Sequence, residues 1–486
     1  MNAGKCRLAA FVAVAVVCWA AQAAASPFEI YGAGARGTAM GGAQVASGEG
    51  PGALFYNVGA LTGSPLGVSG SLLAGIDQTE ILLMPRPGGY EVPDLGGNNP
   101  AVPTSATGTA TDTGPQDPYY ALTLGGVSSL SVDGLRVATL LSVPLDGFFH
   151  LQTHYADERQ RLISNQLQHT LIGERVRHLD LQLGVAYELL PWLSVGVGGS
   201  FMVGAEPYTD AFIEDLSNQN DVDINADVET TSNWGLSLGA KFDLPSNLEA
   251  GLSYRTQSAF TIEGANRIRL GTAGPEDEQF ATQELNWTPV YTPEAGSLGL
   301  AWVSDAITVE GAARYTRWSK FVDTHSNETD FSDTLSPRLG AEWRYDENLR
   351  VRAGLGYEPT PVPEQTGRTN YVDNERVLGS IGAGHRVNAL GEAFEVNWSI
   401  QIQALIPRQH RKAESGDYPD CAEGVTQICD EVPDDTADPR TGQPYAAAQG
   451  LQTGNPGFPG YSSGGWMGAL RIEIAWLDEP ADKGGE

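Results

Sequence analysis

The sequence lacks long hydrophobic runs. Beyond Ala25, no stretch of about 20 consecutive apolar residues occurs, so no transmembrane helix is predicted. Basic residues are also scarce, since 29 Lys and Arg stand against 60 Asp and Glu, a formal net charge of −31. A strongly acidic chain repels polyanions, which disfavours nucleic acid or a phosphate-rich surface as a partner.

Cysteine is equally rare, with four residues in the 486-residue chain. Two of them, Cys6 and Cys18, belong to the apolar N-terminus, and the other two are Cys421 and Cys429. In an exported protein this isolated pair predicts a local disulfide. The spacing of the pair and the lack of a nearby histidine do not fit a zinc site.

The signatures of common catalytic sites are missing too. The chain has no GxSxG elbow, no HExxH helix and no GxxxxGK[ST] phosphate loop, and its seven histidines form no recognisable constellation. We therefore expect that the protein is not an enzyme and holds no cofactor and no metal.

The first residues read as a secretory signal. A basic start at Lys5 and Arg7 precedes the short apolar stretch Leu8–Val17, and three alanines end the segment. We predict a signal peptide over residues 1–25, because the apolar stretch is too short to span a bilayer as an anchor. Lipidation at Cys18 is disfavoured, since the residue before it is not small.

Most of the remaining chain alternates apolar with small or polar residues, which is the period of a β-strand. One such apolar face carries Leu179, Leu181, Leu183, Val185 and Tyr187. A soluble β-sandwich alternates in the same way. Aromatic residues at the ends of the apolar faces, opposite a polar face, favour a membrane barrel with a wet or plugged lumen.

The pattern predicts about fourteen strands joined alternately by tight turns and long loops. The predicted strands are 64–74, 118–130, 135–145, 178–190, 192–206, 231–243, 247–263, 279–303, 306–320, 332–345, 348–358, 375–388, 392–406 and 464–477. This is the topology of an outer-membrane barrel with both ends in the periplasm. The fold class is thus an all-β antiparallel transmembrane barrel over 64–477, followed by a periplasmic tail, 478–486.

Two long loops carry recognisable patterns. Residues 156–176 place apolar side chains at nearly helical spacing, which predicts a surface helix that packs on neighbouring loops or docks an apolar ligand. Residues 414–438 are rich in acidic side chains but lack the spacing of an EF-hand, so a solvated loop is favoured over a calcium site.

Several segments resemble the FadL family of outer-membrane transporters for long-chain fatty acids and aromatic hydrocarbons. They are "ARGTAMGGAQVASGEGPGALFYNVGAL", "AGLSYRTQSAFTIEG", "ARYTRWSKF" and "LRVRAGLGYEPTPVPEQ", in the family's order. The resemblance implies a fourteen-stranded barrel, an N-terminal hatch inside the lumen, and a hydrophobic ligand path to an opening in the wall at a kinked third strand.

The segment 26–63 is the expected hatch. Gly or Ala fills 16 of the 30 positions in Gly32–Leu61, and small residues allow backbone to pack closely inside a lumen. A disordered periplasmic tail is the alternative, although the embedded apolar side chains disfavour it. Family hatches commonly have Asn-Pro-Ala where this chain has Asn57, Val58 and Gly59, so a different local turn is expected.

Some side chains are candidates for the ligand path. They are Leu54, Phe55, Tyr56, Asn57, Pro144, Arg314 and Arg352. Pro144 either breaks pairing of the third strand or only ends it at the rim. Alternation also places Arg255 and Arg350 on the lumen face, and each of these four arginines is either a lumen ion-pair residue or a ligand group. His325 stands near a position where a basic residue is expected.

The resulting functional prediction is passive uptake of hydrophobic compounds through a plugged barrel with lateral release. A general porin for polar solutes and a surface adhesin or receptor are the alternatives. The expected partners are an apolar small molecule, outer-membrane lipid and lipopolysaccharide, with no nucleic acid, and the expected state is a monomer.

Overall fold

The computed structural model describes residues 28–84, 110–111, 119–145, 149–151, 176–178, 180–213, 222–270, 279–321, 329–366, 371–389, 392–411 and 460–478. Outside these ranges lie the predicted signal peptide, the acidic loop 414–438, Cys421, Cys429, His325 and nearly all of the predicted helix 156–176. Among the described residues, no helix has the length and apolar character needed to cross a membrane.

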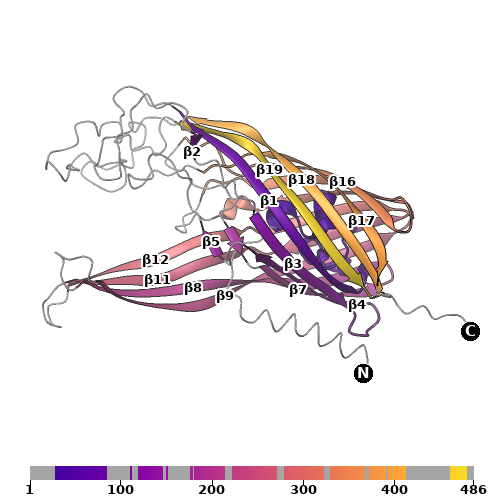
Figure 1. Ribbon diagram of the computed structural model, residues 1–486, viewed down its shortest axis with the longest axis horizontal. Coiled ribbons are helices and arrows are strands. Elements are labelled where there is room, and N and C mark those ends of the chain that lie inside the picture. The colour runs from indigo at the N-terminus through magenta and orange to yellow at the C-terminus, as the bar shows by residue number, and fades with distance from the viewer. Residues whose placement is uncertain are drawn as a thin grey trace, which may run out of the picture.

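Fourteen antiparallel strands form a closed ring (Figure 1). In order around the ring they are β1 (Gly67–Leu83), β3 (Tyr119–Ser128), β4 (Leu135–Pro144), β7 (Asp180–Leu190), β8 (Leu193–Ile213), β9 (Val222–Leu244), β10 (Leu248–Arg255), β13 (Ala295–Val303), β14 (Ile307–Thr316), β15 (Thr334–Arg344), β16 (Leu349–Glu358), β17 (Arg376–Ala389), β18 (Glu392–Arg411) and β19 (Gly460–Leu477). The ring closes where β1 pairs with β19, from Gly67 opposite Leu477 to Leu83 opposite Tyr461. The predicted strand number and barrel fold are confirmed.

The alternation of each strand separates a lipid face from a lumen face. Along β14, for example, Thr308, Glu310 and Ala312 are buried inside, whereas Ile307 and Val309 are exposed outside. Aromatic residues stand near both ends of the outer face, with Trp302 and Trp343 beside tight turns and Tyr315 near the opposite end. Such girdles lie at the two interfaces of an outer-membrane barrel.

Four segments extend past the end of the barrel. Where long loops were predicted at 207–230 and 264–278, β8 and β9 pair as far as Ile213 opposite Val222, and β11 (Ser258–Leu270) pairs with β12 (Gln279–Thr292). β11 also pairs in parallel with β8, so the two hairpins form one projecting sheet (Figure 1). The expectation of loops there was wrong, because strands outside the membrane need no apolar face to mark them. Short pairs add β2 (Ala110–Thr111), β5 (Phe149–Leu151) and β6 (Val176–His178).

The third wall strand, β4, is regular. It pairs with β3 from Val137 to Pro144 and with β7 from Leu135 to Ser142, with no shift of register on either side. Pro144 is the last residue of the strand, two positions beyond its final pair with β7. Of the two readings of Pro144, the structure therefore supports an end at the rim, and the kink implied by the family resemblance is not seen in this strand.

The N-terminal residues occupy the lumen (Figure 1, indigo). They form α2 (Phe28–Tyr31), α3 (Gly34–Ala39), α4 (Ala53–Tyr56) and the 3-10 helix η2 (Val58–Gly63), and most of their side chains are buried. α3 contacts β16 to β19, while η2 contacts β4 and β7 to β10 on the other side. We refer to residues 28–63 as the hatch segment.

Close approach of the hatch segment depends on wall glycines. A Cβ at Gly354 would lie 2.2 Å from the backbone nitrogen of Gly41, and one at Gly251 would lie 2.0 Å from the carbonyl oxygen of Val45. Val58, in the place of the family's Pro, packs over Gly196. Backbone therefore meets backbone without intervening side chains, which small residues alone permit.

Candidate functional site

A pocket opens between the hatch segment and the wall strands β10, β13, β14 and β15. Its lining includes Phe28, Glu29, Ile30, Tyr31, Val45, Phe55, Tyr56, Ser253, Arg255, Ala295, Ser297, Ala312, Arg314, Arg338 and Gln401. The space between these groups, including the part open to the lumen, is about 730 Å³. We call it the lumen pocket. It combines aromatic and aliphatic walls with a few charged groups, as small-molecule sites do.

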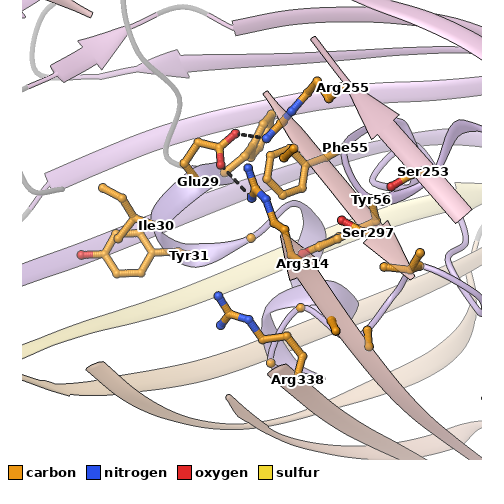
Figure 2. Close-up of a pocket in the computed structure, with 18 of the residues that line it drawn as sticks. Glu29, Ile30, Tyr31, Phe55, Tyr56, Ser253, Arg255, Ser297, Arg314 and Arg338 are labelled. Atoms are coloured by element: carbon orange, nitrogen blue, oxygen red, sulfur yellow. Dashed lines mark hydrogen bonds and ion pairs between the residues drawn. The ribbon is translucent and has the colours of Figure 1, made fainter. Parts of the chain in front are cut away.

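The charged groups of the lumen pocket are joined through one carboxylate. Glu29 accepts a bond from Arg255 at 2.6 Å on one oxygen and from Arg314 at 2.9 Å on the other (Figure 2). The guanidinium of Arg255 also lies 5.0 Å from the centre of the Phe55 ring, in cation–π range. The third arginine, Arg338, pairs with Glu358.

Burial and charge act in opposite directions on Glu29. Burial raises the pKa of its carboxyl. The positive charges of Arg255 and Arg314 lower the pKa by more than burial raises it, so the pKa lies below its ordinary value. Glu29 is therefore ionised at neutral pH. Burial likewise raises the pKa of Tyr56 to about 12, and its neutral hydroxyl accepts a bond from Ala33 N at 2.9 Å.

An apolar contact network leads from the lumen pocket toward the third wall strand. Pocket residues Phe28 and Phe55 pack with Leu54, which belongs to the same buried cluster as Val58 on η2 and Leu140 on β4. Leu54 and Val58 also face Gly184 of β7. This side of the hatch segment therefore meets the wall through apolar groups.

The opposite side of the hatch segment is polar. There a cavity lies between the segment and β1, β3, β4 and β16 to β19, lined by charged groups that include Glu49, Arg136, Arg350, Arg386 and Glu473. We call it the polar cavity. Apolar side chains, among them Leu66, Val127 and Trp476, line the rest of it, so an apolar solute would meet a mixed surface there.

Buried carboxylates of the wall hold the hatch segment in place. Glu310 accepts bonds from the backbone nitrogens of Val45, Ala46 and Ser47 at 2.6, 2.9 and 2.9 Å and from the Ser47 hydroxyl at 2.6 Å. Glu342 pairs with Arg36 at 3.0 Å and with Arg352 at 2.7 Å. Removing one partner of such a buried cluster leaves an uncompensated charge, which is costly.

The structure brings three of the predicted path residues into the lumen pocket. Phe55, Tyr56 and Arg314 line it, together with Arg255 from the lumen-face candidates. Leu54 lies behind the pocket in the apolar cluster. These positions agree with a ligand path, which stays a prediction.

Three other candidates make contacts that stabilise the fold and do not line the lumen pocket. Asn57 donates to Val45 O and Ala240 O and accepts from Gly59 N, so it caps η2 and fastens it to the wall. Arg352 is 1% exposed and bound to Glu342, Asn397 and Glu395, and Pro144 stands at the rim. Arg350 faces the polar cavity, where it pairs with Glu49 and Glu395.

Sequence reasoning missed Glu29, Ile30 and Arg338. Arg338 does alternate onto the lumen face of β15, so the strand period was a usable signal. Glu29 and Ile30 stand just after the predicted cleavage site, in a segment without period, and no pattern marked them. No group of three or more metal-ligating side chains occurs among the described residues.

A family model described as outer membrane protein transport protein (OMPP1/FadL/TodX) matches residues 170–402. The match lies within a fourteen-stranded barrel whose lumen holds the N-terminal residues. The chain is similar to the FadL/TodX family. It is an outer-membrane β-barrel protein, as predicted.

Curated relatives of the FadL/TodX family align over part of their length. Alkane uptake protein A of Marinobacter nauticus is 25% identical over 259 residues, which cover 47% of this chain and 56% of that protein. The long-chain fatty acid transport protein of Escherichia coli K12 is 25% identical over 191 residues, covering 35% and 43%. The chain thus matches about half the length of these two relatives, which are named as an uptake and a transport protein.

Solved structures of the FadL/TodX family agree with the fold over nearly the whole chain. A Pseudomonas aeruginosa FadL homologue superposes with a TM-score of 0.55 at 14% identity, covering 91% of this chain and 98% of that one. The P. putida toluene transporter TodX gives 0.51 at 13% identity, covering 93% and 99%. At such identities the likeness establishes the shared barrel.

Proposed function

We propose that this protein carries hydrophobic compounds across the outer membrane, with neutral hydrocarbons as its main substrate class. The observation that carries the proposal is the lumen pocket, in which aromatic and aliphatic groups of the hatch segment face the small residues Ala295 and Ala312 of the wall. The names of the curated relatives support hydrophobic compounds in general, since they include fatty acid transport proteins, and the alkane uptake protein supports neutral hydrocarbons.

The physical requirement is an unbroken apolar path. Exposing a hydrocarbon to water costs about 0.8 kcal/mol per CH₂, so a twelve-carbon chain faces roughly 10 kcal/mol at any wet gap. The lumen pocket continues through Phe28, Phe55 and Leu54 toward β4, whereas charged groups interrupt the lining of the polar cavity. We infer that a ligand moves along the β4 side of the hatch segment once the segment shifts.

Uptake by proteoliposomes tests the proposal. Vesicles that contain the protein should accumulate radiolabelled hexadecane and toluene faster than empty vesicles. If the purified protein neither binds nor passes any apolar compound, the proposal is wrong.

The hatch distinguishes this function from that of a porin. Deleting residues 26–62 should turn the barrel into a leaky channel, because the segment fills the lumen. A porin would keep its conductance after the same deletion. An adhesin or receptor would bind no apolar ligand in the lumen pocket.

A further inference from the structure

We infer that Glu29 is a specificity-determining residue, an internal carboxylate that occupies the arginine pair of the lumen pocket and so selects neutral ligands over carboxylates. The inference rests on the proposed function and names the ligand class that the lumen pocket disfavours.

Glu29 is held by the wall in the way that a separate carboxylate ligand could be held. Its two oxygens are each held by a different guanidinium, from Arg255 on β10 and Arg314 on β14. Charge-assisted bonds of this kind are the strongest way in which proteins hold a carboxylate. The Phe55 ring lies next to the pair, and Ile30 and Tyr31 line the same pocket farther along (Figure 2).

Glu29 fills the position between the guanidiniums of Arg255 and Arg314, where its single negative charge offsets one of their two positive charges. Arg255 and Arg314 share Glu29, and the remaining arginine among the described lining residues, Arg338, is paired with Glu358. An incoming carboxylate must therefore displace Glu29 or stay next to it, and like charges at such a distance repel. A neutral chain leaves both ion pairs intact.

Glu29 can be displaced more readily than the other carboxylates of this lumen. Its side chain is 32% exposed to the lumen, compared with 1% for Glu342. It belongs to α2, a helix of four residues at the start of the described chain. Removing its charge should thus free the arginine pair without disrupting the buried ion pairs of Arg36 and Glu342.

Binding of oleate tests the inference, with the full-length protein in nanodiscs and empty nanodiscs as the partition blank. Glu29→Gln should bind oleate about tenfold more tightly than the wild type, since a charged partner becomes available. Glu49→Gln is the matched control, because it removes another hatch carboxylate that pairs with arginines at the polar cavity. It should bind oleate as the wild type does.

A double variant and an uncharged ligand complete the test. Glu29→Gln combined with Arg314→Gln should lose the gain, because the anion site is then incomplete. The wild type itself should bind methyl oleate, which has the same tail and no charge, about tenfold more tightly than oleate. If Glu29→Gln binds oleate no better than the wild type, or the wild type does not distinguish oleate from methyl oleate, the inference is overturned. Failure of the wild type to bind hexadecane would instead refute the proposed function.

Discussion

Glu310 is the strongest single attachment of the hatch segment, and its loss should open the barrel. The two oxygens of this fully buried carboxylate accept four hydrogen bonds from Val45, Ala46 and Ser47. Glu310→Gln keeps the shape of the side chain. It replaces one acceptor oxygen with an NH₂ donor that faces donors, so one pair of bonds is lost and the other pair loses its charge.

The magnitude follows from those bonds. Hydrogen bonds to a charged group contribute about 1.5–3 kcal/mol each, and a buried donor without a partner costs a similar amount. A conservative figure for the variant is about 3 kcal/mol of local hatch stability. Because about 1.4 kcal/mol corresponds to a tenfold change in an equilibrium, the population of displaced hatch should rise roughly a hundredfold.

Two assays report this population directly. Arg36 is the sole Lys or Arg between residues 26 and 66, so trypsin cleavage after it measures exposure of the hatch segment. Conductance across a planar bilayer measures the open lumen. Both should rise in Glu310→Gln and stay at the wild-type level in Glu249→Gln, which loses a wall carboxylate that pairs with Lys241 instead. Equal cleavage and equal leak in Glu310→Gln and the wild type would refute the assignment of Glu310 as an anchor.

Three further predictions follow from the same contacts. Gly354→Ala should lower the stability of the seated hatch segment by about 1–3 kcal/mol and so raise the leak, since its Cβ would lie 2.2 Å from Gly41 N. Gly311→Ala is the control and should have no effect, because a Cβ there has no atom within 4 Å. Asn57→Ala should lower hatch stability by about 1–3 kcal/mol, because two buried carbonyls lose their donor, and more trypsin cleavage after Arg36 would check it. For Glu29, a folded pKa below the ordinary 4.5 means that the ion pairs with Arg255 and Arg314 are complete above that value and are lost as the pH falls through the lowered pKa, so an infrared or NMR titration should find this carboxyl ionised at both pH 7 and pH 5.

The barrel was predictable because lipid imposes a simple rule on each strand. Every second residue must be apolar where the strand crosses the membrane, and this period gave the fourteen wall strands. The rule stops at the membrane surface, which is why the extensions of β8 and β11 were taken for loops. Polar strands outside the bilayer leave no comparable mark in a sequence.

The lumen was less predictable, because it depends on contacts between residues far apart in the chain. Alternation correctly placed Arg255, Arg314, Arg350 and Arg352 inside, but it could not separate the pair at the lumen pocket from the pair beside the polar cavity. That division is decided by which wall positions the hatch segment touches. Glu29 could not be predicted for the same reason, since its role depends on two arginines that are distant in the sequence.

The last strand of the barrel has a bearing on biogenesis. β19 carries Arg471, which donates to Gly32 O at 2.7 Å, and Glu473, which accepts from Ala35 N at 3.0 Å. The ring closes where β19 meets β1, so these two bonds join the last strand to residues from the beginning of the chain. We expect the hatch segment to act as an internal template for this final pairing. Variants at its contacts with β19 would slow membrane insertion and accumulate as unclosed intermediates even where the finished barrel is stable.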